Sequence, residues 1–228
     1  MRHLKVTFML VGLIVVVFLG TASAGQFGAP EPLASSGNIS LGIGYFYNSD
    51  KLELGSEDYR FSQNQIYLQF SATLEKIEFY IRGGGADFKL ENAFPNGDFN
   101  DNYKLFGTMG VKGMLDINDY LGIGAFAQGS LFSTYKSQGV EIKDLGEADV
   151  GLMLQGKFDK IRVYAGPFLY WTHAKAESTV SGSSGLNQSN NFGGVAGIRV
   201  PIAQGINIEI EGQYRQEFSA GAAISYSF

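Results

Sequence analysis

Apolar and polar side chains alternate along most of the chain, in short segments that begin at Gly37 and run to the last residue. In the first segment the odd-numbered positions from Ile39 to Tyr47 are apolar or aromatic, and the residues between them are mostly polar or small. A period of two with one apolar face predicts a β-strand, because successive side chains of a strand point to opposite sides of the sheet. Ten segments have this pattern, near residues 37–48, 65–74, 77–82, 104–115, 121–131, 147–158, 161–171, 195–202, 206–215 and 218–228. The chain is therefore predicted to be all-β.

The connections between these segments alternate in length. Only Glu75 and Lys76 lie between Leu74 and Ile77, and a two-residue hairpin places those two apolar side chains opposite each other on one face. Short turns also follow the fourth, sixth and eighth segments, whereas longer polar segments lie near residues 49–62, 89–102, 136–145 and 175–190. This order predicts antiparallel strands that run up and down, with short turns at one end of the sheet and longer loops at the other.

The polar face of the predicted strands carries charges of both signs. These charged residues are Glu78, Arg82, Lys104, Lys112, Glu147, Asp149, Lys157, Arg162, Arg199, Glu209, Glu211 and Arg215. The same face also carries large aromatic side chains, such as Phe46, Tyr67 and Tyr164, among many glycines. Large and small residues together suit a confined interior better than an open surface. We therefore expect the polar face to line a lumen in which the charges pair across a narrow space.

Aromatic residues lie near the strand ends on the apolar face, where the two interfaces of a membrane would fall. They are Tyr45, Tyr47, Phe158, Trp171, Tyr214 and Phe218. Aromatic girdles flank the apolar band of outer-membrane barrels, and a sheet that crosses lipid must close, because an open edge would leave backbone groups unpaired. The sequence thus predicts a closed antiparallel up-and-down transmembrane β-barrel of ten strands, whose last strand pairs with the first. Eight strands is the alternative count, because the glycine-rich residues 193–197 weaken the eighth segment.

The first residues have the pattern of an export signal. Arg2 and Lys5 precede an apolar stretch at residues 6–19, and small residues up to Ala24 follow it. The stretch is shorter than the roughly 20 residues that span a bilayer as a helix. We therefore expect a signal peptide over residues 1–24, with cleavage after Ala24.

The rest of the chain is expected to contain a flexible leader and one barrel domain. The leader covers residues 25–36, which include Pro30, Pro32 and several small residues, and the barrel covers residues 37–228. The sequence has no cysteine, so this exported domain is stabilised without disulfides. A net charge of −5 argues against a nucleic-acid partner, and no cofactor is expected.

The chain ends with Ile224, Tyr226 and Phe228, separated by serines. This ending resembles the C-terminal signature of Gram-negative outer-membrane β-barrel proteins, and the pattern from Gly37 onward is similar to the small single-chain barrels of the OmpA and OmpX kind. The resemblance implies export through the inner membrane by a cleaved signal peptide, and insertion into outer-membrane lipid by the barrel-assembly machinery, which reads the last strand. We expect a monomer. The resemblance identifies no activity.

His173 is the one histidine after the predicted cleavage point, and it lies at the loop end of its strand. Ten-stranded outer-membrane proteases of the omptin family carry catalytic His and Asp residues at this end, and Asp98 and Asp101 lie in a predicted loop. Trp171, however, stands where that family has an Asp two residues before the His. We expect no metal site, because the acidic spacing that begins at Asp98 lacks the glycine of a calcium loop.

Three functions follow from these observations. The leading hypothesis is a non-enzymatic integral outer-membrane barrel with an envelope structural or surface-interaction role, since the interior of a barrel of this size is largely filled by side chains. The second is a narrow porin for small polar solutes, with water beside the inward charges. The third is a loop-borne hydrolase centred on His173.

Overall fold

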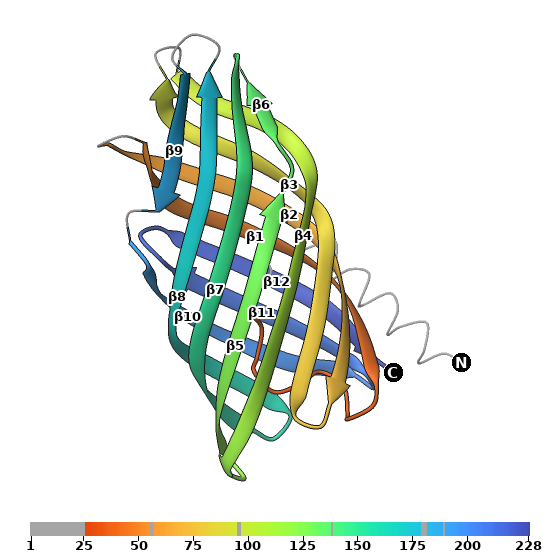
Figure 1. Cartoon of the computed structure of the whole chain (residues 1–228). Helices are drawn as coiled ribbons and strands as arrows, with labels where there is room; N and C mark the ends of the chain where they lie inside the picture. Colours follow the sequence, from red (N-terminus) through yellow and green to blue (C-terminus); the bar gives the residue numbers. More distant parts are fainter. Residues whose placement is uncertain (1–25, 55–56, 95–96, 138, 179–181, 189) are drawn as a thin grey trace.

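The computed structural model describes residues 26–54, 57–94, 97–137, 139–178, 182–188 and 190–228, and the strands among them form one antiparallel β-sheet (Figure 1). Its strands are β1 (Ile39–Leu54), β2 (Glu57–Leu74), β3 (Ile77–Phe94), β4 (Gly97–Asn118), β5 (Leu121–Phe132), β6 (Tyr135–Ser137), β7 (Val140–Phe158), β8 (Ile161–Ser178), β9 (Gly182–Gln188), β10 (Phe192–Ala203), β11 (Ile206–Tyr214) and β12 (Phe218–Ser227). In this part of the chain, no helix is long and apolar enough to cross a bilayer. The predicted signal peptide, residues 1–24, lies outside the described residues.

Ten of these strands close into a barrel, which confirms the predicted fold and strand number. Pairing follows chain order through β1, β2, β3, β4, β5, β7, β8, β10, β11 and β12, and β12 pairs back onto β1. That last contact runs from Ser40↔Ser227 to Tyr47↔Ala220. The short strands β6 and β9 lie at the end of the barrel opposite the two-residue turns (Figure 1). We call these two ends the tall end and the turn end.

The apolar parity of the strands points outward and the polar parity points inward. Leu68, Leu105 and Met109 expose 66%, 76% and 70% of their surfaces although they are large apolar residues, whereas the adjacent residues Tyr67 and Thr108 are buried inside. A broad apolar band around the outside of a closed sheet is typical of contact with lipid.

The predicted long polar loops are wrong over most of their length, because the strands continue through them. β1 and β2 stay paired up to Leu54↔Glu57, and β3 and β4 up to Phe94↔Gly97. In this region apolar side chains point inward, and they form one buried group, the tall-end cluster: Leu52, Phe61, Phe88, Leu90, Phe99, Tyr135, Val140, Ile142, Leu145, Ala174, Ala176 and Leu186. Where a strand extends beyond the membrane, its outer side chains are polar and its inner side chains are apolar. The apolar parity is therefore opposite to that of the membrane-spanning part, and the segment was interpreted as a polar loop.

The strands β10, β11 and β12 end below the tip of the tall end, and β9 lies above their ends (Figure 1). β9 pairs with β8 from His173↔Asn187 onward and with β1 at Leu52↔Gln188. Between β9 and the ends of these strands, hydrogen bonds from side chains take the place of backbone pairing. For example, Ser219 Oγ is hydrogen-bonded to the backbone of Ser49.

Residues 26–36, which we call the plug, lie inside the barrel as far as Ala34, and Ser35 and Ser36 are exposed where the chain leaves it. Phe27 and Ala29 have no exposed surface, and Gln26 is almost completely buried. The chain leaves the lumen at the turn end, where the N–H of Gly37 donates to the carbonyl of Thr73 at 2.8 Å. The sequence analysis expected a flexible leader here, and it did not predict that this segment lies inside the lumen. Small residues and prolines are common in linkers, but they also fit a narrow lumen.

Candidate functional site

The lumen contains a large number of charged side chains. Among the described residues, six carboxylates and four cations are buried: Asp50, Glu78, Glu147, Asp149, Glu209, Glu211, Arg82, Lys112, Arg199 and Arg215. A buried charge is costly unless hydrogen bonds or an opposite charge replace the lost water. The backbone of the plug supplies many of these partners.

Glu211 holds the inner end of the plug. Its carboxylate accepts hydrogen bonds from the backbone N–H groups of Gln26, Phe27 and Gly28, at 2.8, 3.1 and 2.8 Å. Successive amides can converge on one anion when the backbone turns sharply, and Gly28 allows this turn with a φ of 74°. Tyr164 donates to the same carboxylate at 2.9 Å. The plug and the wall together replace the water that Glu211 has lost.

Glu209 and Arg199 hold the next part of the plug. They form an ion pair, with 3.2 Å between Arg199 Nε and Glu209 Oε1. Arg199 also donates to the backbone carbonyls of Ala29, at 3.1 Å, and Glu31, at 2.6 Å. Glu209 in turn accepts from the N–H of Ala29. Both sides of the plug backbone are therefore bound at this level.

A third level lies nearer the turn end. The N–H of Leu33 donates to Glu78 at 2.7 Å, and Glu78 lies 3.6 Å from Lys112 Nζ. Glu31, the one charged side chain of the plug, pairs with Arg162 at the mouth of the lumen. The plug is thus bound by the wall along its whole length.

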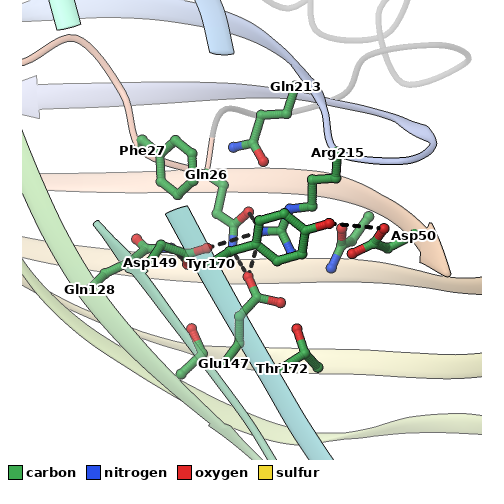
Figure 2. Close-up of polar contacts among 12 residues, drawn as sticks. Gln26, Phe27, Asp50, Gln128, Glu147, Asp149, Tyr170, Thr172, Gln213 and Arg215 are labelled. Atoms are coloured by element: carbon green, nitrogen blue, oxygen red, sulfur yellow. Dashed lines mark hydrogen bonds and ion pairs between the residues drawn. The ribbon is translucent and has the colours of Figure 1, made fainter. Parts of the chain in front are cut away.

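Arg215 lies at the inner end of the plug, with Glu147 and Asp149 on one side and Asp50 on the other (Figure 2). Its Nη2 lies 2.6 Å from Glu147 Oε1 and 3.2 Å from Asp149 Oδ1. The same nitrogen donates to the side chain of Gln26 at 3.2 Å. The guanidinium also packs 4.4 Å from the centre of the Tyr170 ring, a cation–π contact.

A hollow lined by Leu33, Ser35 and Gln204 opens at the turn end, and the space beside Gly28 is smaller. A cavity of about 20 Å³ is lined by Gly28, Tyr67, Arg82 and Glu209, among others. That is room for about one water molecule. Beyond Arg215 the tall-end cluster packs into the lumen, so the plug and this cluster occupy successive parts of the described barrel.

Solved structures with a similar fold come from bacterial outer membranes, although no protein-family model and no curated protein matches the chain. An outer-membrane channel from Pseudomonas putida F1 aligns with a TM-score of 0.54 at 8% identity, over 90% of this chain and 98% of that one. The outer-membrane protease OmpT of Escherichia coli aligns with a TM-score of 0.48 at 12% identity, over 88% and 100% of the two chains. The chain has the fold of a Gram-negative outer-membrane β-barrel. Short turns of such barrels face the periplasm, and we name the two ends by this rule: the turn end is called periplasmic and the tall end extracellular.

The outer-membrane barrel brings most of the predicted lumen charges together. Nine are buried inside it: Glu78, Arg82, Lys112, Glu147, Asp149, Arg199, Glu209, Glu211 and Arg215. Lys157 and Arg162 lie at the periplasmic mouth beside Glu31. Lys104 is partly exposed and lies 3.5 Å from Asp101, away from the other charges.

Three residues of this site were not predicted. Gln26 and Glu31 belong to the segment interpreted as a leader, and nothing in their composition distinguishes a plug from a linker. Asp50 falls in a segment interpreted as a loop. Extending the inward parity of Phe46 and Asn48 by one step would have included it.

The predicted girdle residues lie on the outer face near the strand ends. Tyr45, Tyr47, Trp171, Tyr214 and Phe218 are in the extracellular half, and Phe158 is at a periplasmic turn. At the C-terminus, Ile224 pairs with Ile43, and the N–H of Phe228 donates to the carbonyl of Ile39 at 3.1 Å. Tyr226 and Phe228 are exposed on the outside, with their ring centres 4.9 Å apart. The last strand therefore closes the barrel and presents its aromatic side chains to lipid.

His173 is exposed on β8, and its partner is an amide. Its Nδ1 lies 2.9 Å from Asn187 Oδ1. The two aspartates considered with it have lysine partners: Asp98 lies 3.2 Å from Lys89, and Asp101 lies 3.5 Å from Lys104. The geometry therefore gives His173 no carboxylate of this pair to orient it.

The outer face of the extracellular wall carries charges of both signs in pairs. Glu141 lies 2.7 Å from Lys136 and 3.1 Å from Lys143, and these two lysines hold the pKa of Glu141 below its usual range. Lys175, 2.9 Å from Asp144, likewise lowers the pKa of that aspartate. Exposed pairs of this kind add little stability, so their effect is to keep the wall polar where it stands in water.

Proposed function

We propose that this protein is a non-enzymatic, monomeric barrel of the outer membrane, with a lumen closed by its own N-terminal segment and an envelope structural or surface-interaction role. The observation that carries this proposal is the binding of the plug at three levels, through Glu211, through Glu209 with Arg199, and through Glu78. At each level a charged wall residue bonds to the plug backbone instead of to water. A solute could cross only by breaking these contacts.

The extracellular end supports the same function. The tall-end cluster packs Phe88 against the rings of Phe61, Phe99 and Tyr135, at centre distances of 4.9, 5.7 and 5.1 Å. An apolar cluster of this size excludes water and stiffens the wall that rises above the membrane. A rigid wall with paired charges on its outside is suited to contacts at the cell surface.

A narrow porin is the second candidate, and the difference between the two halves of the lumen favours it. The extracellular half of the lumen is filled by apolar side chains of the wall, so a lumen without water does not require charged residues in this barrel. The half around the plug is lined by charges, which would tolerate water whenever the plug left. This candidate differs from the first in a measurable quantity, the ionic conductance.

The experiment is single-channel recording of the folded protein in a planar lipid bilayer. Folding is verified beforehand by gel migration, since a folded barrel runs faster when it is not boiled. We expect no discrete openings, because the plug and the tall-end cluster block the lumen in series. Discrete openings of the folded, unmodified barrel would contradict the closed lumen and support the narrow porin.

A further inference from the structure

The backbone N–H groups of residues 26–33 are all bonded to side chains of the wall. The acceptors are Glu211, which takes three of them, and Glu209, Gln155 and Glu78, which take one each. The two remaining residues of this stretch are Pro30 and Pro32, which have no N–H to donate. Every backbone donor between residues 26 and 33 therefore has an acceptor in the wall.

Backbone carbonyls of the same stretch are bonded to the wall as well. Four of them accept hydrogen bonds, and the donors are Arg82, Arg199 and Ser227. Where proteins bind peptides in an extended form, bonds to the main chain give affinity and pockets for side chains give specificity. The bonds to the main chain do not depend on which side chains the bound segment carries.

The wall also has pockets for particular side chains of the plug. Phe27 packs against the rings of Phe126 and Phe168, with ring centres 4.1 and 4.9 Å away. Pro30 lies against Gly124, where an added Cβ would lie only 2.2 Å from Pro30 Cβ. These two pockets select an aromatic residue and, three positions later, a proline.

The charges of this wall exceed what filling the lumen requires. Apolar side chains alone fill the tall end, and replacing buried charges by well-packed apolar residues often leaves stability unchanged or higher. The plug has one charged side chain, Glu31, so the charges of the wall face mainly its backbone. Buried charges aligned along a backbone are the chemistry of a peptide-binding site.

We propose that the half of the lumen around the plug is a binding site for an extended segment of a second polypeptide, and that the plug is its resident ligand. The second segment has an aromatic residue followed by glycine, and prolines two and four positions after that glycine, in the order of Phe27, Gly28, Pro30 and Pro32. It enters from the turn end, where the hollow beside Leu33 opens. This inference rests on the docked plug of the proposed function and adds a partner to it.

The test lets a synthetic peptide with the sequence of residues 26–36 compete with the plug. The full chain carrying Ala29→Cys is folded in lipid vesicles with the peptide at about 1 mM, the order of the effective concentration of a segment on a short tether. A water-soluble maleimide then labels the barrels whose plug has been displaced. Without peptide the cysteine should be protected. With the peptide, about half of the barrels should react, because two equal ligands compete at similar concentrations.

The matched control is a peptide of the same composition, in which each proline changes places with the residue before it. This peptide lacks the two N–H groups that donate to Glu209 and Gln155, so it should bind at least about tenfold more weakly. It should displace the plug from about a tenth of the barrels or fewer. Full protection with both peptides would overturn the proposal. Equal displacement by both would also overturn it, because the wall would then not recognise the backbone.

The unmodified barrel provides a second measurement if the Ala29→Cys chain does not fold. It is folded with the same two peptides, each carrying a fluorophore after its last residue, and run on a gel without boiling. Fluorescence should migrate with the folded barrel for the first peptide and not for the control, and a folded band without fluorescence would contradict the inference. A cysteine that reacts without any peptide overturns the closed lumen of the proposed function, whereas protection under every condition overturns this inference alone.

Discussion

Gly28 lies where the plug passes close to two charged side chains of the wall. Its φ of 74° falls in the left-handed region, and an added Cβ would lie 2.8 Å from Glu209 Oε2 and 3.0 Å from Lys112 Nζ. Gly28→Ala should therefore lower the free energy of unfolding by about 2 kcal/mol, since the left-handed backbone alone costs an L-residue about 1–2 kcal/mol. Urea unfolding of the barrel in lipid vesicles measures this change.

Gly37 offers the matched control. Its φ is 81°, but nothing lies within 4 Å of an added Cβ, so Gly37→Ala keeps the backbone cost without the collision. The loss for Gly37→Ala should be clearly smaller than the loss for Gly28→Ala. Equal losses would show that the plug does not press against the wall at Gly28.

Among the strands, β2 and β3 approach each other unusually closely at Gly84. A Cβ on Gly84 would lie 1.9 Å from the carbonyl oxygen of Ile66, whereas one on the neighbouring Gly83 would meet nothing within 4 Å. Gly84→Ala should cost about 3 kcal/mol, because the backbone of two paired strands must move apart. Gly83→Ala, on the outer face of the same strand, should leave stability unchanged or slightly higher. The comparison fails if both variants unfold at the same urea concentration.

The extracellular extension of the strands depends on the tall-end cluster. Phe88 is fully buried among three aromatic rings, and Phe88→Ala should lower the free energy of unfolding by about 3–5 kcal/mol. Lys136→Ala, on the outer face of the same wall, should change it by less than about 0.5 kcal/mol. A Phe88→Ala barrel as stable as the parent would contradict the role given to this cluster.

The sequence predicted the membrane-spanning elements well because one physical rule governs them. Lipid requires an apolar outer face, so Leu68 and Leu105 identify their strands and set the inward direction of Tyr67 and Phe106. The extracellular half follows the reversed rule, with Leu52 and Phe88 inward, and was therefore interpreted as loops. The plug follows neither rule, because its backbone rather than its side chains makes most of the contacts.

At the scale of the whole molecule, the barrel contains two interiors with different physical character. The periplasmic part of the lumen is ionic and is filled by a segment of the same chain, and the extracellular part is apolar and is filled by wall side chains. The plug contributes one charged side chain, Glu31, and binds mainly through its backbone. Its position inside the closed barrel is the central claim on which the proposed function depends.

Cysteine labelling tests this claim most directly, because the chain contains no cysteine of its own. In the folded barrel, Ala29→Cys should be protected from a water-soluble maleimide, since residue 29 has no exposed surface. Ser35→Cys, at an exposed position of the same segment, should react within seconds to minutes and serves as the control. Both should react equally in urea. Equal rates for the two cysteines in the folded barrel would show that the segment lies outside the lumen and would contradict the account.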